Sequence, residues 1–198
     1  AALEMLLRAY SRLHSRTTIH ERRFSAIHAN FIPHDLAALC RQMSILLDMQ
    51  PAWLYKDADA MIEILGRDRM KTFHPYRNML QAGIRICAGS DHMVKLDPRK
   101  SVNPFDPFIG IYALTTHKTE NGTCLMPDQS VSRLDALSFY TVNNAFKSGE
   151  ETVKGSIEPG KLADFAVLDD DFLNCRPEQL LDMAVSRTVL GGRTVYQR

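Results

Sequence analysis

The stretch Ile84-Arg85-Ile86-Cys87-Ala88-Gly89-Ser90-Asp91 predicts a buried β-strand that begins directly after a helix. Gly83 ends the helical pattern of residues 69–81, and the strand starts with almost no loop between the two elements. Connections this short are typical of an αβ unit, in which a helix leads into a strand of a parallel sheet. The stretch ends on two small residues followed by a carboxylate, which lets the backbone approach a metal or substrate closely.

Upstream of this strand, helical and extended patterns alternate in the same way. A helix is expected over residues 1–16, and an extended run covers residues 23–28. Pro33-His34-Asp35 opens the next helix, where Asp35 can help cap the N-terminus. The apolar run 44–49 stops at Gln50-Pro51, as a buried strand does. This alternation predicts an α/β protein with a parallel sheet, and both a doubly wound sheet and a (β/α) barrel fit it.

Downstream of Asp91 the pattern changes. Residues 92–106 predict a loop, and helices are expected over residues 108–117 and 132–147. Beyond Gly149 the sequence predicts short strands and turns, with extended runs at 153–157, 163–168, 185–190 and 194–196. We therefore expect two units, an α/β unit over residues 1–149 and a mostly β unit over residues 150–198.

The composition excludes several classes of protein. Among 198 residues, 24 Lys and Arg face 23 Asp and Glu, so there is no basic surplus for nucleic acid. No apolar run approaches the roughly 20 residues that span a bilayer, and the first residues lack the regions of a signal peptide. The four cysteines are widely spaced, which argues against a disulfide framework or a zinc ribbon. We expect a cytoplasmic protein with free thiols.

Two side chains that can bind metal follow predicted strands. His28 ends the extended run 23–28, and Asp91 ends the stretch from Ile84. In parallel α/β folds the carboxyl ends of strands gather ligands and catalytic groups. An imidazole there can ligate a divalent ion, and a carboxylate can both ligate it and take a proton from the attacking water. His92 is a candidate for substrate contact. A structural histidine at His28 and a loop-capping carboxylate at Asp91 remain open alternatives.

Several segments resemble, in the right order, the amidohydrolase superfamily. Residues 155–168 (GSIEPGKLADFAVL) match the "G-S-I-x-x-G-K-x-A-D-x-x-V-L" signature of its C-terminal β-domain. Residues 27–29 (IHA), 49–51 (MQP), 88–91 (AGSD) and 132–141 (SRLDALSFYT) resemble segments of the family-3 branch, which holds D-aminoacylase-like and imidase-like enzymes. The resemblance covers the chain from about residue 20 to its end.

This resemblance implies a fold, a chemistry and roles for residues. The fold would be the C-terminal part of a metal-dependent hydrolase (β/α)8 TIM barrel, plus part of a small β-sandwich domain. The activity would be hydrolysis of a non-peptide C–N bond in a small molecule by a metal-activated water. His28 would be the sixth-strand metal ligand, and Asp91 the eighth-strand ligand and proton shuttle. The cofactor would be one or two divalent ions, with zinc expected. Whether the protein forms a homo-oligomer is left open by the sequence.

The sequence also departs from the family pattern. The paired histidines of strand one, the bridging residue of strand four and the histidine of strand five have no counterpart. They would lie upstream of Ala1, so the chain is expected to be a fragment. His92 and the segment Thr116-His117-Lys118 also differ from the family, which bears on the substrate.

Two other hypotheses remain open on the sequence. The chain could be a catalytically inactive, truncated barrel module that acts in protein–protein association through open sheet edges and apolar helix faces. It could also be a doubly wound binding domain unrelated to amidohydrolases, in which case the match over residues 155–168 would be chance.

Overall fold

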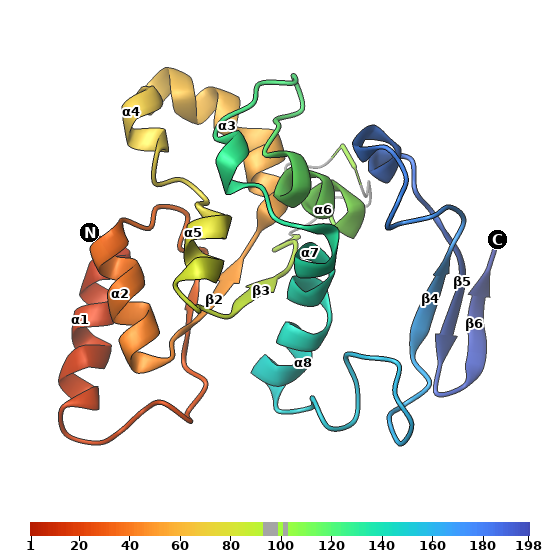
Figure 1. Ribbon diagram of the computed structural model, residues 1–198, viewed down its shortest axis with the longest axis horizontal. Helices are drawn as coiled ribbons and strands as arrows, with labels where there is room; N and C mark the ends of the chain where they lie inside the picture. Colours follow the sequence, from red (N-terminus) through yellow and green to blue (C-terminus); the bar gives the residue numbers. More distant parts are fainter. Residues whose placement is uncertain (93–98, 101–102) are drawn as a thin grey trace.

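A computed structural model describes residues 1–92, 99–100 and 103–198. The described chain forms two three-stranded sheets with helices between and around them (Figure 1). The first sheet is parallel in the order β1-β2-β3, and its strands are β1 (Ser25–Ile27), β2 (Leu46–Met49) and β3 (Ile86–Ala88). The sequence therefore predicted the parallel α/β arrangement correctly.

The two faces of the parallel sheet differ in their cover. Ala26, Leu47 and Ile86 lie in one row across the strands and are fully buried under the helices. The next row consists of Ile27, Asp48 and Cys87, and Ile27 is 61% exposed. A parallel sheet normally has both faces covered, in a barrel by the helices outside and by the other strands inside. One face of the sheet is therefore covered by helices, and the other face is partly open.

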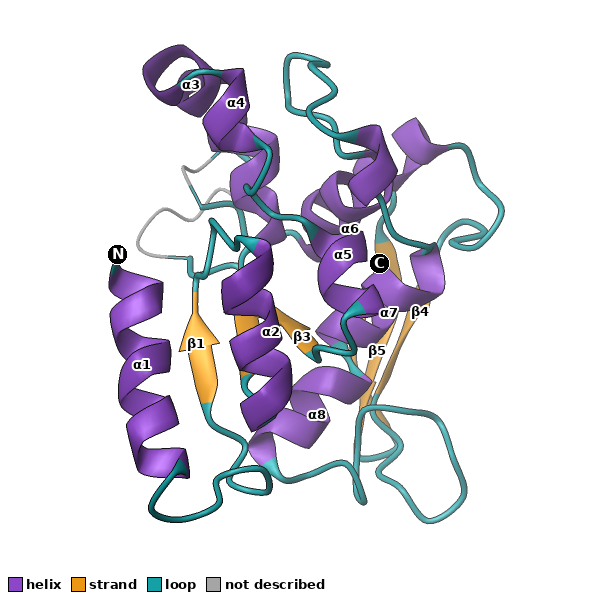
Figure 2. Cartoon of the chain, turned by 60° about the vertical axis from the view of Figure 1, so that its left-hand side comes forward, coloured by secondary structure: helices purple, strands orange, loops and turns teal. Residues whose placement is uncertain are grey.

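Helices connect and cover the strands. Figure 2 shows α1 and α2 lying along β1. The helices before β3 are α1 (Ala2–His14), α2 (His34–Met43), α3 (Pro51–Leu65), α4 (Arg67–Met70) and α5 (Tyr76–Gln81). Those after β3 are α6 (Pro107–Thr116), α7 (Arg133–Tyr140) and α8 (Val142–Ser148). Within the described ranges, no helix has the length and apolar character that crossing a membrane requires.

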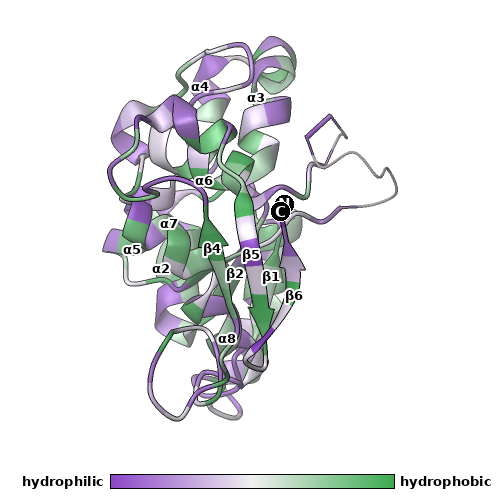
Figure 3. Cartoon of the chain, turned by 90° about the vertical axis from the view of Figure 1, so that its right-hand side faces the viewer, coloured by the Kyte–Doolittle hydropathy of each residue, from purple (hydrophilic) through white to green (hydrophobic). Residues whose placement is uncertain are grey.

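The second sheet is antiparallel, in the order β4-β5-β6, and lies on the far side of α7 and α8 (Figure 1). Its strands are β4 (Phe165–Leu168), β5 (Val185–Leu190) and β6 (Arg193–Gln197). Every residue of β6 is exposed, and Phe165, Val167 and Leu190 of β4 and β5 are 37%, 42% and 58% exposed. Figure 3 shows hydrophobic residues along β4 and β5. A single three-stranded sheet with this much exposed apolar surface lacks the second layer that completes a sandwich.

Three expectations about the helices were wrong. The helix expected over residues 69–81 is divided into α4 and α5, because Pro75 disfavours helical backbone at His74, which has φ 52°. The helix expected over residues 132–147 is divided at Thr141, whose φ and ψ are −121° and −92°. Asp35 makes no capping hydrogen bond, since Pro33 is the N-cap residue of α2.

The strand expected over residues 153–157 is a series of turns. Gly155 has φ 96°, and a Cβ at this position would lie 2.6 Å from the Cβ of Ala145 on α8. Only glycine permits both the left-handed backbone and this close approach. The glycine of this segment thus makes a tight packing contact and does not belong to a strand.

The outer edge of β3 is covered by two amides of α8. Asn143 Nδ2 donates to the carbonyl of Ile86 at 2.7 Å, and Asn144 Nδ2 donates to the carbonyl of Ala88 at 2.9 Å. These carbonyls alternate along the strand and point away from β2, which binds the carbonyl of Arg85. An unpaired sheet edge is a template for association, and here two side chains occupy it.

A buried histidine pair joins the loops that follow β1 and precede α5. His74 Nε2 donates to Asn30 Oδ1 at 3.0 Å, and its Nδ1 accepts from the Tyr76 hydroxyl at 3.0 Å. His117 Nε2 donates to the carbonyl of His74 at 3.1 Å. Burial lowers the pKa of His74 to about 3 and that of His117 to about 4. Both rings are therefore neutral in the folded protein at pH 7.

Replacing Asn143 with Ala should lower the free energy of unfolding by about 1–3 kcal/mol, because the buried Ile86 carbonyl loses its donor. Urea unfolding measures the change. Asn121→Ala is the matched control, since that amide bonds at the surface, and it should change stability by less than about 0.5 kcal/mol. Equal effects of the two variants would show that the edge contact contributes nothing specific.

Acid should destabilise the fold through the histidine pair. The pKa values of both rings lie below the ordinary value of 6.5 in the folded state, so the unfolded chain binds more protons below pH 6.5. Stability is complete above that pH and should fall by up to about 2 kcal/mol per histidine at pH 5. His117→Asn, which tolerates the φ of 54°, should reduce the pH slope of urea unfolding. The exposed control His34→Asn should leave that slope unchanged.

Candidate metal site at the sheet edge

Polar side chains from all three parallel strands meet at the carboxyl edge of the first sheet. His28 follows β1 directly, Gln50 follows β2 directly, and Asp91 lies three residues beyond the end of β3. Because parallel strands end at the same edge, their following residues share one side of the fold. The arrangement places the two predicted metal ligands on the strands that flank β2.

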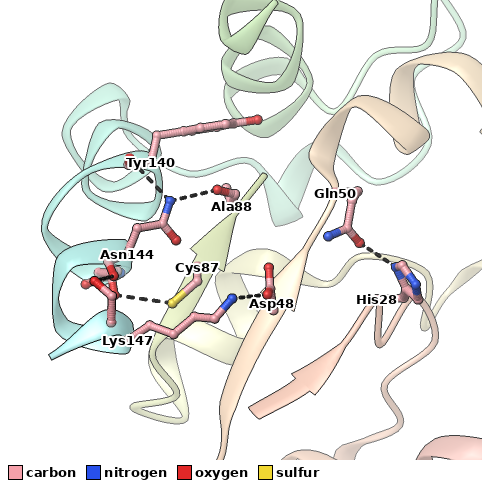
Figure 4. Close-up of polar contacts among 10 residues, drawn as sticks. His28, Asp48, Gln50, Cys87, Ala88, Tyr140, Asn144 and Lys147 are labelled. Atoms are coloured by element: carbon pink, nitrogen blue, oxygen red, sulfur yellow. Dashed lines mark hydrogen bonds and ion pairs between the residues drawn. The ribbon is translucent and has the colours of Figure 1, made fainter. Parts of the chain in front are cut away.

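His28 is held by its backbone and by its ring (Figure 4). Its N–H donates to the carbonyl of Asp48 at 2.8 Å, and its φ is 69°. Nδ1 lies 2.8 Å from Gln50 Oε1, and the ring stacks on Trp53 with centroids 4.9 Å apart at 20°. Gln50 is itself 4% exposed. The ring is therefore oriented by two side chains that belong to one four-residue segment.

Asp91 and His92 occupy the other end of this edge. Asp91 is exposed and has φ 48°, and its carboxylate contacts no other side chain of the described residues. Its carbonyl accepts from Asn103 Nδ2 at 2.8 Å. His92 Nδ1 lies 2.8 Å from the carbonyl of Asn103, and its ring meets Phe105 edge-on at 4.7 Å. The half-buried His92 is thus packed into the loop, and its contact with substrate stays a prediction.

His28 and Asp91 are side chains of the kind that bind a divalent ion, but they supply only part of a ligand set. Gln50 binds one ring nitrogen of His28 and leaves the other outside that bond, and the Asp91 carboxylate makes no hydrogen bond or ion pair with another described side chain. Zinc and similar ions accept both donor types. Among the described residues, however, no cluster of three His, Cys, Asp or Glu side chains could hold a metal. A catalytic zinc usually takes three protein ligands, so the described residues alone do not make a complete zinc site.

An ion pair lies on the partly open face of the sheet, below this edge. Lys147 of α8 contacts the carboxylate of Asp48, which is two residues before Gln50 on the same strand (Figure 4). Cys87 lies next to Asp48 in the neighbouring strand and donates to the carbonyl of Asn143. Burial raises the pKa of Cys87 to about 11, so its thiol is protonated at pH 7.

The described structure also contains a cavity of about 1340 Å³. It separates α7 and α8 from the second sheet and includes neither His28 nor Asp91 in its lining. Its walls carry exposed apolar side chains, with Leu134 at 62% and Ile157 at 83% exposure. The cavity reaches Asp48 on β2 and Ala88-Gly89 at the end of β3, but neither predicted metal ligand lines it, so we place the chemistry at the sheet edge.

The sequence did not reveal every residue of the site. Gln50 was interpreted only as the end of a strand, and Trp53 and Lys147 were not singled out. The available signal was polarity: Gln50 and Asp48 interrupt an otherwise apolar strand that the pattern placed in the core. A buried polar residue requires a hydrogen-bond partner, and that requirement alone points to a neighbour such as His28.

The fold is that of one part of a metal-dependent hydrolase barrel: parallel strands, helices on one face, and metal-capable side chains at the carboxyl ends. A solved structure of an uncharacterised metal-dependent hydrolase from Pyrococcus horikoshii superposes with a TM-score of 0.70 at 20% identity, over 89% of this chain and 33% of that one. A zinc-bound adenosine deaminase structure from Xanthomonas campestris gives a TM-score of 0.61 at 19% identity, over 95% and 40% of the two chains.

The sequence identifies the family. Residues 1–196 match the model of the amidohydrolase family, and the chain belongs to this family. YtcJ of Bacillus subtilis, named as an amidohydrolase, is 30% identical over 100% of this chain and 36% of its own length. N-substituted formamide deformylase of Arthrobacter pascens is 35% identical over 67% of this chain and 23% of its own. The chain therefore spans about a third or less of these relatives.

The Asp48–Lys147 pair should stabilise α8 against the sheet. Breaking it with Asp48→Asn or Lys147→Met leaves one charge in a partly buried place, at 17% and 35% side-chain exposure. Each single variant should lose about 1–2 kcal/mol of unfolding free energy. The double variant should lose less than the sum of the two, which a double-mutant cycle by urea unfolding measures. Strict additivity would mean that the two charges do not interact in solution.

Proposed function

We propose that this chain contributes a metal ligand, His28, and a proton-transferring carboxylate, Asp91, to an enzyme that hydrolyses a non-peptide C–N bond in a small molecule. The observation that carries the proposal is the orientation of His28 at the carboxyl edge of the parallel sheet. A divalent ion, with zinc as the expected one, would activate water and polarise the substrate carbonyl when bound.

The roles follow from the positions of the two residues. The ring of His28 is restrained on one nitrogen and one face, as a ligand that must keep its direction requires. Asp91 is exposed, so an Oδ atom of its carboxylate can accept a proton from water and pass it to the leaving nitrogen. The remaining donors would come from other parts of a longer protein, since the matched relatives are about three times longer.

The names of the relatives suggest where to look for a substrate. N-substituted formamide deformylase and imidazolonepropionase are named for reactions on small nitrogen-containing compounds. We propose N-substituted amides and cyclic amides as the first compounds to test. We also propose that residues 1–149 form part of the catalytic barrel and that residues 150–198 form part of a composite β-domain.

A second candidate, an association module without catalysis, is favoured by one observation. The cavity between α8 and the second sheet is bordered by strongly exposed apolar side chains, as are the faces of β4–β6. Such surfaces normally mark contacts with further protein. This function predicts an oligomer whose assembly does not depend on metal.

The natural protein that contains this chain should hydrolyse such a compound in the presence of zinc. Asp91→Asn should abolish turnover, by at least about a thousandfold, while metal content and melting temperature stay close to wild type. His28→Ala should lower both activity and metal content. Activity assays and elemental analysis measure the two effects, and Asp170→Asn on an exposed turn is the control.

The intact mass of the natural protein is measured first. A mass far above 22.4 kDa gives the missing donors a place within one polypeptide. A mass near 22.4 kDa, together with full activity of Asp91→Asn or a lack of bound metal, would contradict the hydrolase and favour the association module.

A further inference from the structure

We propose that Gln50 is a positioning residue that fixes the tautomer of His28, so that Nδ1 carries the proton and Nε2 presents its lone pair. This inference deepens the proposed function, on which the metal role of His28 rests. The tautomer itself, however, is a property of the metal-free chain and can be measured without activity.

The first step is the hydrogen bond. His28 Nδ1 lies 2.8 Å from the Oε1 atom of Gln50. An amide oxygen can only accept, so the bond forms when Nδ1 is protonated. A neutral imidazole has one proton, and its other nitrogen then keeps a free lone pair. The Gln50 contact thus selects Nε2 as the basic nitrogen.

The second step is the rigidity of the partner. Gln50 is 4% exposed, and it stands between the last residue of β2 and the first residue of α3. Its backbone carbonyl accepts from the backbone N–H of Trp53 at 3.0 Å, which ties the backbone of Gln50 to the first turn of α3. A buried amide anchored between a strand and a helix has few alternative positions, so it holds the imidazole in one place.

The third step is the restriction of the ring plane. Trp53 stacks on His28 at 4.9 Å and 20°, so rotation of the imidazole about its side-chain bonds would break this contact. The backbone of His28 is fixed separately, because its N–H bonds to the carbonyl of Asp48 on the strand that leads to Gln50. One segment, residues 48–53, therefore sets the backbone, the tautomer and the plane of His28.

The geometry matches how metal-binding histidines are commonly oriented. Such a ring donates its second nitrogen's proton to an oxygen acceptor, and loss of that acceptor typically weakens metal binding about 10- to 100-fold. In most sites the acceptor is a carboxylate, a backbone carbonyl or water. Gln50 supplies a neutral amide instead, so it directs the ring without adding negative charge.

The test is nitrogen NMR of the chain labelled with ¹⁵N-histidine and free of metal, with His28→Ala used to assign the signal. The wild-type chain should show His28 as the Nδ1–H tautomer. Gln50→Glu, which keeps the oxygen acceptor, should retain it, and Gln50→Leu should lose it. The exposed control Gln81→Leu should match the wild type. Two results would overturn the proposal. One is an Nε2–H signal in the wild type, which a reversed Gln50 amide would give, and the other is an unchanged tautomer in Gln50→Leu.

A zinc titration of the natural protein separates this inference from the proposed function. Gln50→Leu should weaken zinc binding about 10- to 100-fold, and Gln50→Glu should restore it. Zinc affinity that is insensitive to His28→Ala would overturn the metal role of His28 and, with it, the role of Gln50 toward metal. In that event the NMR result still decides whether Gln50 sets the tautomer.

Discussion

The rest of the structure depends on how the parallel sheet satisfies the backbone groups of its outer edge. Strand β3 has β2 on one side, and on the other its carbonyls would face solvent or another strand. The amides of Asn143 and Asn144 take the Ile86 and Ala88 carbonyls, which fixes α8 against this edge. With α8 fixed, Lys147 reaches Asp48 and Gly155 packs on Ala145. The path of the chain into the second sheet follows from these contacts.

The same constraint explains how the candidate site is arranged. A parallel sheet brings the ends of its strands to one edge, but it does not aim the side chains there. Left-handed backbone at His28, Ala29 and Asp91 turns the chain sharply beyond β1 and β3. Non-glycine residues rarely adopt this conformation, and it persists only where surrounding contacts hold it. At His28 these contacts are known: the Asp48 carbonyl, the Gln50 amide and the Trp53 ring.

Much of the fold followed from the sequence, because strand and helix patterns depend on local spacing of apolar residues. The parallel strands near His28, Met49 and Ala88 were predicted in this way, as were the strands over residues 185–190 and 194–196. The failures were all places where local preference met another constraint. Pro75 divided a helix, and the packing of Gly155 on α8 replaced a strand by turns. Neither the neighbour of Gly155 nor the partner of Gln50 can be known from spacing, since each contact joins elements distant in the sequence.

The two incomplete features of the chain have one physical interpretation. The carboxyl edge offers two metal donors where a catalytic zinc commonly has three, and the sheet face that carries Ile27 is only partly covered. In a (β/α) barrel both gaps are filled by the same elements, because the strands that cover the inner face also end at the carboxyl edge. A segment of such a barrel is therefore expected to lack some of the metal donors and also the cover of its inner sheet face. The rigid support of His28 by Gln50 and Trp53 is local to this segment, so the direction of the His28 ring does not depend on other parts of a barrel.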